Sequence, residues 1–229
     1  MWLILFLIFV IFVYYGIPYI HGKYAKRILK NKAGKLKVLA LTFDDGPSDN
    51  LTIAIMDLLD KHNAKASFFL LGLNVSGREN IVRQISERGH EICSHGFEHL
   101  NYWKISPWRS ITDIKKGWET IDSVLGTNKN VYSFRPPYGK LNIVSLAYLL
   151  LKKVPVFYWT DDSGDSWKIK PDNDQLSKLV ENSSGAVTLS HDFNRKEEKT
   201  ELWVLESIRL VLEKANEKNM DFVTVSQLN

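Results

Sequence analysis

Residues 37–47 read KVLALTFDDGP, a short apolar run that leads directly into two adjacent carboxylates. The run from Val38 to Phe43 has the length and composition of a buried strand. Asp, Gly and Pro favour chain reversal, so Asp44 and Asp45 mark the end of that strand. Two neighbouring carboxylates in such a place can serve one reaction in two capacities, one binding a metal while the other abstracts a proton from water.

Apolar runs and helical periodicities alternate along the rest of the chain. Seven strands are expected, at residues 38–43, 66–71, 91–94, 131–134, 154–159, 186–190 and 222–225. Six helices are expected between them, at residues 50–62, 79–88, 110–125, 143–152, 174–181 and 201–216. This alternation predicts a parallel α/β architecture, most simply a barrel or partial barrel. Catalytic groups in such folds gather where the strands end.

The third expected strand leads into residues 94–99, SHGFEH. His95 and His99 lie four residues apart and can converge in a helix or in a tight loop. Alone, this pair is weak evidence for a metal site. With an aspartate it forms a set of two histidines and one carboxylate, which suits zinc or another divalent transition metal with an open position for water.

Two further strand ends carry polar groups. The fourth strand is followed by residues 135–139, RPPYG, and the stiffness of this turn would fix Arg135 toward the paired carboxylates. The same turn could aim a backbone N–H at a developing oxyanion. The sixth strand ends in His191, which could supply a general acid.

In this order, the motifs resemble the five motifs of the polysaccharide deacetylases, the NodB-homology domain of carbohydrate esterase family 4. The matching stretches are TFDDG at 42–46, HxxxH at 95–99, RPPYG at 135–139, an Asp-rich loop before Trp167, and LxH at 189–191. The resemblance covers roughly residues 37–228. It implies a distorted (β/α) barrel with about seven strands and metal-dependent removal of N-acetyl groups from amino sugars, as in a glycan or a lipid-linked saccharide.

The resemblance also implies a role for each motif residue. Asp45, His95 and His99 would hold a divalent metal, with Zn²⁺ as the main expectation and Co²⁺, Ni²⁺ or Mn²⁺ as alternatives.

The remaining motif residues would carry the acid–base chemistry. Asp44 would be the general base, oriented by Arg135, and His191 would protonate the leaving amine. The backbone N–H of Tyr138 would help the metal to stabilise the oxyanion of the tetrahedral intermediate.

Two motifs depart from the family pattern. Gly96 stands where the second motif usually carries Ser or Thr, so a side-chain hydrogen bond that steadies the loop is missing.

The fourth motif usually reads Asp-x-x-Asp-Trp, whereas Ser166 here separates the second aspartate from Trp167. Either Asp162 or Asp165 would tune the general acid or the arginine, and Trp167 would line the acetyl pocket. Leu189 is expected beside them as a substrate-binding or orienting residue.

The N-terminal segment is apolar. Residues 2–20 contain no charge over 19 positions, close to the roughly 20 that cross a bilayer core as a helix. A retained single-pass anchor is favoured over a cleaved signal, because the segment lacks a basic start and a small-residue exit. The expected division is a transmembrane anchor at 1–21, a basic juxtamembrane linker at 22–36 and a deacetylase domain at 37–229.

The charge distribution argues against nucleic-acid binding. The chain has 30 Lys and Arg against 26 Asp and Glu, a net charge of 30 − 26 = +4. Seven of the basic residues and no acidic ones fall in residues 1–37, which leaves 23 − 26 = −3 for the rest. The folded domain therefore lacks the basic surface that grips phosphates. The basic flank favours a cytoplasmic domain, whereas the habit of the family is extracytoplasmic.

Two alternatives to deacetylation stay open. The same residues would serve a deformylase or amidase acting on a lipid-linked sugar or another amide. A catalytically silent glycan-binding module tethered to the membrane is the other alternative, which the presence of all five metal and acid–base residues disfavours. The protein is expected to act as a monomer.

Overall fold

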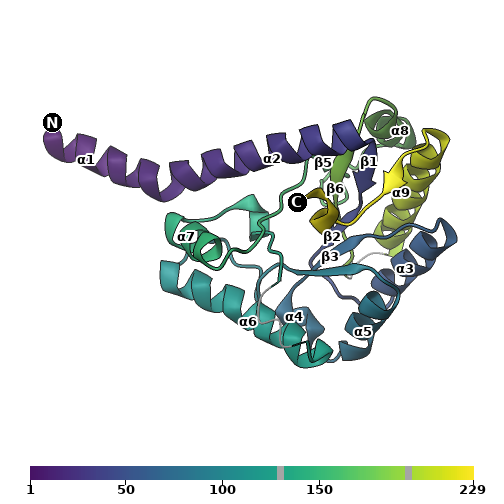
Figure 1. Ribbon diagram of the computed structural model, residues 1–229, viewed down its shortest axis with the longest axis horizontal. Helices are drawn as coiled ribbons and strands as arrows, with labels where there is room; N and C mark the ends of the chain where they lie inside the picture. Colours follow the sequence, from purple (N-terminus) through teal and green to yellow (C-terminus); the bar gives the residue numbers. More distant parts are fainter. Residues whose placement is uncertain (128–131, 194–197) are drawn as a thin grey trace.

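The computed structural model describes residues 1–127, 132–193 and 198–229 (Figure 1). The strands are β1 Val38–Ala40, β2 Thr42–Asp44, β3 Ser67–Leu70, β4 Glu91–Ser94, β5 Asp161–Asp162, β6 Ala186–His191 and β7 Asp221–Phe222. The helices are α1 Trp2–Ile11, η1 Phe12–Gly16, α2 Ile17–Leu36, α3 Leu51–Lys61, α4 Gly72–Val75, α5 Glu79–Glu87, α6 Pro107–Leu125, η2 Pro137–Gly139, α7 Ile143–Leu151, α8 Asn173–Glu181, α9 Glu198–Glu217 and η3 Val225–Leu228.

The strands form a parallel sheet that closes on itself. Its order is β4-β3-β2-β6-β1-β7, and β5 pairs with β6. Beyond β4, single bridges join Ser94 to Phe134 and Phe134 to Val156. The chain then returns to β6, where the Thr160 N–H donates to the Val187 carbonyl at 2.8 Å. The sheet is therefore a distorted (β/α) barrel of seven strands, as expected from the sequence.

The first expected strand is in fact two strands. The run at 38–43 divides at Leu41 into β1 and β2, which both pair with β6 on one side. On the other side β1 pairs with β7 and β2 pairs with β3. The change of neighbour explains the break, because one straight strand could not reach both partners.

Three other strand predictions need correction. The runs expected at 131–134 and 154–159 contribute only the bridges at Phe134 and Val156, and Val131 lies outside the described residues. Pro155 lacks the N–H that a ladder needs, and Pro136 and Pro137 follow the first run after one intervening residue. The last run, expected at 222–225, is a strand only at Asp221–Phe222 and turns into the 3₁₀-helix η3.

The strand β5 was not predicted. Asp162, expected in the Asp-rich loop before Trp167, and its neighbour Asp161 pair with Leu189 and Thr188 of β6. Two aspartates carry no strand signal of their own. Their pairing comes from the closure of the barrel, which brings this segment against an otherwise open edge of β6.

The N-terminal segment forms one helical stretch from Trp2 to Leu36, long and apolar enough to cross a membrane, as an anchor or a signal sequence can. In Figure 1, α1 extends away from the domain, whereas α2 lies along it beside β1, β5 and β6. The residues expected as a linker are thus helical and packed. Leu29 and Ala33 are buried against the barrel residues Val38, Phe157 and Val187.

Candidate active site

The parallel strands bring the sequence motifs to one edge of the barrel. Asp44 at the end of β2 lies opposite His191 at the end of β6. On the other side of β2, the pairing of β3 with β4 places Ser94 at the same edge, so His95 follows directly. Residues from three separate parts of the sequence therefore meet where these strands end.

Asp45, His95 and His99 form a compact group of metal-ligating atoms, all within 4.8 Å of one another. The Oδ1 atom of Asp45 lies 3.4 Å from Nε2 of His99 and 3.7 Å from Nε2 of His95. This buried Oδ1 has no hydrogen-bond partner among the described residues. Two imidazoles and an unpartnered carboxylate oxygen fit a divalent transition metal. We call this group the metal triad.

The orientation of His95 supports this assignment. Its Nδ1 lies 2.8 Å from the carbonyl oxygen of Arg135. Because a carbonyl can only accept, the hydrogen sits on Nδ1 and the lone pair on Nε2 faces Asp45. Burial, foremost, lowers the pKa of His95 to about 3, so the ring is neutral and free to ligate.

The loop from His95 to His99 is held by Asp113 of α6. The Asp113 carboxylate accepts hydrogen bonds from the backbone N–H groups of Phe97, at 3.1 Å, and Glu98, at 2.9 Å. Gly96 has a φ of 88°, and a side chain there would collide with this carboxylate. Asp113 therefore steadies the loop, which is the role that the resemblance assigns to a Ser or Thr side chain at position 96.

Sequence reasoning missed Asp113, although a signal was present. The buried face of α6 is a helical stripe: Ser110, Asp113, Ile114, Gly117, Trp118 and Ile121. A charged residue in such a stripe requires partners, because an unpaired buried charge is costly. The neighbouring loop supplies them.

Asp44 and Arg135 form a buried pair beside the triad. Nη1 of Arg135 lies 2.7 Å from Oδ1 of Asp44 and also donates to Oγ1 of Thr42 at 2.7 Å. The guanidinium packs on the ring of Phe69, 4.0 Å from its centroid. Burial raises the pKa of Asp44, and the positive charges of Arg135 and His191 act against that rise.

His191 is held by Asp165. The carboxylate accepts from the backbone N–H of His191 at 2.7 Å and lies 2.8 Å from its Nδ1. Burial alone would lower the pKa of His191, but the hydrogen bond and charge of Asp165, with Asp44 and Asp45, raise it to about 9. The imidazole is therefore protonated at neutral pH.

The geometry separates the two aspartates that the sequence left open. Asp165 contacts His191, whereas Asp162 accepts from the backbone N–H of Gly164 at 2.9 Å and so shapes the loop. The extra Ser166 thus leaves the bond to the histidine in place. Trp167 is half exposed, with its indole close to Gly164.

Leu189 and Tyr138 border the same region. Leu189 is buried and lies two residues before His191 on β6, so both side chains point to the same side of the strand. Tyr138 adopts a left-handed conformation, with φ at 57°, and its ring packs on His99 with 4.5 Å between centroids.

Asp192 is a second buried acid that sequence reasoning did not use. Its Oδ2 accepts from Oγ1 of Thr52 at 2.7 Å, and burial, foremost, raises its pKa to about 7. A side chain at position 46 would collide with the Asp192 carboxylate, so Gly46 in the TFDDG motif is required by close packing.

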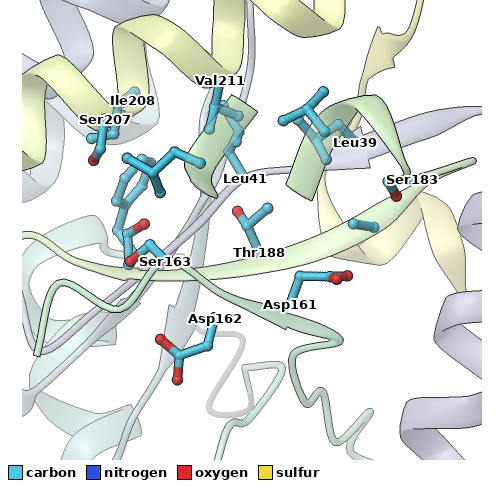
Figure 2. A pocket seen from close by; sticks show the side chains of 15 residues that line it. Leu39, Leu41, Asp161, Asp162, Ser163, Ser183, Thr188, Ser207, Ile208 and Val211 are labelled. Atoms are coloured by element: carbon cyan, nitrogen blue, oxygen red, sulfur yellow. The ribbon is translucent and has the colours of Figure 1, made fainter. Parts of the chain in front are cut away.

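A separate cavity of about 40 Å³ lies between the sheet and the C-terminal helices (Figure 2). Its walls include Leu39, Leu41, Ile208 and Val211, and Asp162 extends away from them in this view. The volume is that of very few water molecules. The lining of this mainly apolar gap does not include the metal triad, Asp44, Arg135 or His191.

Comparison with known proteins assigns the family. The family model described as Polysaccharide deacetylase matches residues 31–155. The chain belongs to the polysaccharide deacetylase family. Among its relatives, the peptidoglycan-N-acetylglucosamine deacetylase PgdA of Listeria monocytogenes is 31% identical over 198 residues, or 86% of this chain and 40% of PgdA. The chain thus spans less than half of that relative.

Other members of the polysaccharide deacetylase family match over most of their length. A peptidoglycan-N-acetylglucosamine deacetylase of Bacillus cereus is 30% identical over 195 residues, 84% of this chain and 88% of that protein. The crystal structure of the Bc1960 peptidoglycan N-acetylglucosamine deacetylase superposes with a TM-score of 0.74 and 29% identity, covering 84% of this chain and 87% of that one. The barrel is therefore that of the polysaccharide deacetylases.

Proposed function

We propose that this protein is a metal-dependent hydrolase that removes N-acetyl groups from amino sugars of the N-acetylglucosamine type. The observation that carries the proposal is the placement of the metal triad at the same edge of the barrel as two partnered groups, the Asp44–Arg135 pair and the His191–Asp165 pair. The names of its relatives, which are deacetylases of peptidoglycan and chitooligosaccharide, support the same reaction.

Asp45, His95 and His99 would hold the metal. A divalent cation there, Zn²⁺ or alternatively Co²⁺, Ni²⁺ or Mn²⁺, would polarise the amide carbonyl and make water acidic enough to ionise near neutral pH. The neutral state of His95 and the unpartnered oxygen of Asp45 suit this role.

Asp44 would take the proton from the attacking water. The Arg135 guanidinium holds one carboxylate oxygen, which orients the other oxygen of Asp44 toward the side of His95, 3.7 Å away. The same positive charge favours the ionised carboxylate that a base requires.

His191 would protonate the leaving amine. It carries a proton at neutral pH because Asp165 binds its ring, and it lies across from Asp44 on the neighbouring strand. The backbone N–H of Tyr138 would contribute to oxyanion stabilisation, and Leu189, Asp162 and Trp167 would line or shape the substrate site. Loss of one oxyanion donor typically costs on the order of 100-fold in turnover.

The N-terminal stretch would act as a single-pass membrane anchor at residues 1–21. Residues 22–36 would join it to the catalytic domain at 37–229 as a packed helix, which suits substrates at a bilayer surface. A reporter fused to the C-terminus tests on which side of the membrane the domain lies. If a reporter that works only in the cytosol is active in the fusion, the extracytoplasmic placement is excluded.

The test uses the full chain in detergent, loaded with zinc, because α2 packs on the barrel. Acetate release is measured from N-acetylglucosamine oligomers, peptidoglycan and lipid-linked N-acetylglucosamine, for the natural protein and for Asp44→Asn. We expect acetate from at least one substrate and a loss of 100-fold or more, on the order of a general base's contribution, in the variant. Equal release by both proteins would refute the catalytic assignment.

A parallel assay of formate release from N-formyl sugars separates deacetylation from deformylation, which the same residues could perform. Faster turnover of the formyl substrates would place the protein with the alternative chemistry.

A further inference from the structure

A cavity of about 220 Å³ lies between α2 and the loops at the rim of the barrel. Its lining includes three lysines, Lys23, Lys26 and Lys140, and five aromatic residues, among them Trp103, Tyr138 and Trp159. Tyr138 joins this cavity to the metal triad, because its ring also packs on His99. The cavity therefore adjoins the metal triad, with Tyr138 bordering both.

Among the described residues, Lys23, Lys26 and Lys140 form no ion pair with a carboxylate. The lysine ion pairs in residues 1–127, 132–193 and 198–229 are made by Lys30, Lys65, Lys178 and Lys214. Burial, foremost, and then the charges of Lys23 and Arg135 lower the pKa of Lys26, against the opposing effect of Asp162. The lining thus has a surplus of positive charge that an anion would relieve.

Aromatic rings hold all three of these ammonium groups in place. Nζ of Lys26 lies 3.9 Å from the ring centroid of Trp159, Nζ of Lys140 lies 4.9 Å from that of Trp103, and Nζ of Lys23 lies 5.5 Å from that of Tyr19. Such cation–π contacts reduce the rotamer freedom that the side chains would lose on binding a ligand. The exposed parts of the rings offer flat apolar area to a ring-shaped ligand.

The charges at the two neighbouring places differ in how they are balanced. Beside the triad, Arg135 pairs with Asp44 and His191 pairs with Asp165, whereas the cavity is lined by Lys23, Lys26 and Lys140. A ligand with an anionic group next to its amide would place that anion among the lysines, beside the triad. Lys23 and Lys26 also lie within two helical turns of the apolar residues 2–20.

We propose that this cavity binds a phosphate group carried by the amino-sugar substrate, so that phosphorylated saccharides are preferred over neutral ones. Phosphate oxygens accept strong charge-assisted hydrogen bonds from ammonium groups, and three lysines match a group with three terminal oxygens. This inference rests on the proposed function, because it assigns a substrate class to the same site.

The first test measures binding without catalysis. Calorimetry is performed on the full chain in detergent, with the metal chelated, using N-acetylglucosamine 1-phosphate and N-acetylglucosamine at low ionic strength. We expect the phosphate to increase affinity about tenfold or more, as a charge-assisted hydrogen bond would. Equal affinity for the two sugars would overturn the proposal.

Substitutions locate the effect. Lys23→Gln and Lys140→Gln should each weaken binding of the phosphorylated sugar about tenfold and leave the neutral sugar unchanged. Lys35→Gln is the matched control, since Lys35 is exposed on the same helix about three turns further on. An equal loss in the control, or no loss in either cavity variant, would contradict the assignment.

Acetate release from three substrates separates this inference from the proposed function. The substrates are a neutral N-acetylglucosamine oligomer, N-acetylglucosamine 1-phosphate, and N-acetylglucosamine joined through a diphosphate to a lipid. Faster acetate release from either phosphorylated substrate supports the inference. Faster release from the lipid-linked sugar than from N-acetylglucosamine 1-phosphate would identify a lipid headgroup as the source of the phosphate. Fastest acetate release from the neutral oligomer would overturn the inference and leave the proposed deacetylase function standing. Phosphate-dependent binding without any acetate release would support the inference and overturn the proposed function.

Discussion

The metal triad and the acid–base pairs beside it are built in opposite ways. In the triad, a buried oxygen of Asp45 faces two histidine nitrogens at 3.4 and 3.7 Å, and among the described residues no hydrogen bond satisfies it. In the pairs, His191 has two hydrogen bonds to Asp165, and Asp44 is held by Arg135. The chain alone therefore fixes the acid and the base, whereas a bound cation would complete the triad.

This difference predicts separate effects for substitutions in the triad and substitutions in the acid–base pairs. Substitution in the triad should change metal content and leave the stability of the metal-free protein almost untouched. Substitution in the pairs should do the opposite, because their hydrogen bonds exist without the metal.

Asp45→Asn should have the largest effect. Asparagine tolerates the left-handed backbone at this position, where φ is 74°, but it lacks the charge that binds the cation. We expect metal affinity to fall by more than about 100-fold, and activity to fall with it. This loss exceeds the one usually seen when a residue that only supports a metal ligand is replaced. Metal analysis after dialysis measures the loss, with Asp174→Asn on the exposed face of α8 as the control. Retained metal would remove Asp45 from the triad.

Asp165→Asn should act on turnover at high pH. Without the carboxylate, the pKa of His191 should fall from about 9 toward about 6.5, its ordinary value. At pH 8 this removes most of the protonated acid and should lower kcat about thirtyfold, while the basic limb of the pH profile moves to lower pH. Asp162→Asn is the control, and metal content should stay unchanged in both. An unmoved basic limb would show that His191 is not the acid.

Asp113→Asn tests a residue that belongs neither to the triad nor to the acid–base pairs. Asp113 supports the loop of the triad through hydrogen bonds. An amide group in its place would turn donors toward the N–H groups of Phe97 or Glu98. We expect metal affinity to drop about tenfold and the free energy of unfolding to fall by about 1–3 kcal/mol. Glu119→Gln, exposed on the same helix, should change neither quantity. Unchanged metal affinity would limit Asp113 to a folding role.

The smallest effect concerns the pH dependence of stability in the metal-free protein. The pKa of His191 is raised in the folded state, to about 9, so its contribution is fully present below about pH 6.5 and is lost as pH rises through 9. The stability difference between the natural protein and Asp165→Asn should therefore shrink between these pH values. Urea unfolding at pH 6 and pH 9.5 measures it, and a constant difference would contradict the assigned protonation.

Much of the site could be predicted because each motif is short and lies at a strand end. Asp44 and His191, 147 positions apart, are neighbours since parallel strands end at one edge. The choice between Asp162 and Asp165 could not be predicted, because it depends on how the loop containing Ser166 folds back onto β6. Asp113 was recognisable in principle, as a charge within a buried helical stripe.

The errors in the fold have a common cause. Strand β5 and the break at Leu41 depend on which segments the closing barrel brings together, and local composition does not encode that. The packing of α2 on the barrel was missed for the same reason. Its basic residues resembled a solvated flank, although Leu29 and Ala33 at one-turn spacing fit a buried face.

The continuous helix α2 fixes the position of the active site relative to the apolar N-terminal stretch. From Ile17 to Leu36 the backbone rises about 1.5 Å and turns about 100° with each residue, and its second half is fixed to the barrel by Leu29 and Ala33. The number of residues between the apolar stretch and Lys26 therefore sets both the distance of the cavity from that stretch and the direction, about the helix axis, in which the cavity opens. One residue inserted between Ile20 and His21 would turn the apolar stretch by about 100° relative to the cavity and leave Lys23, Lys26 and the metal triad in place.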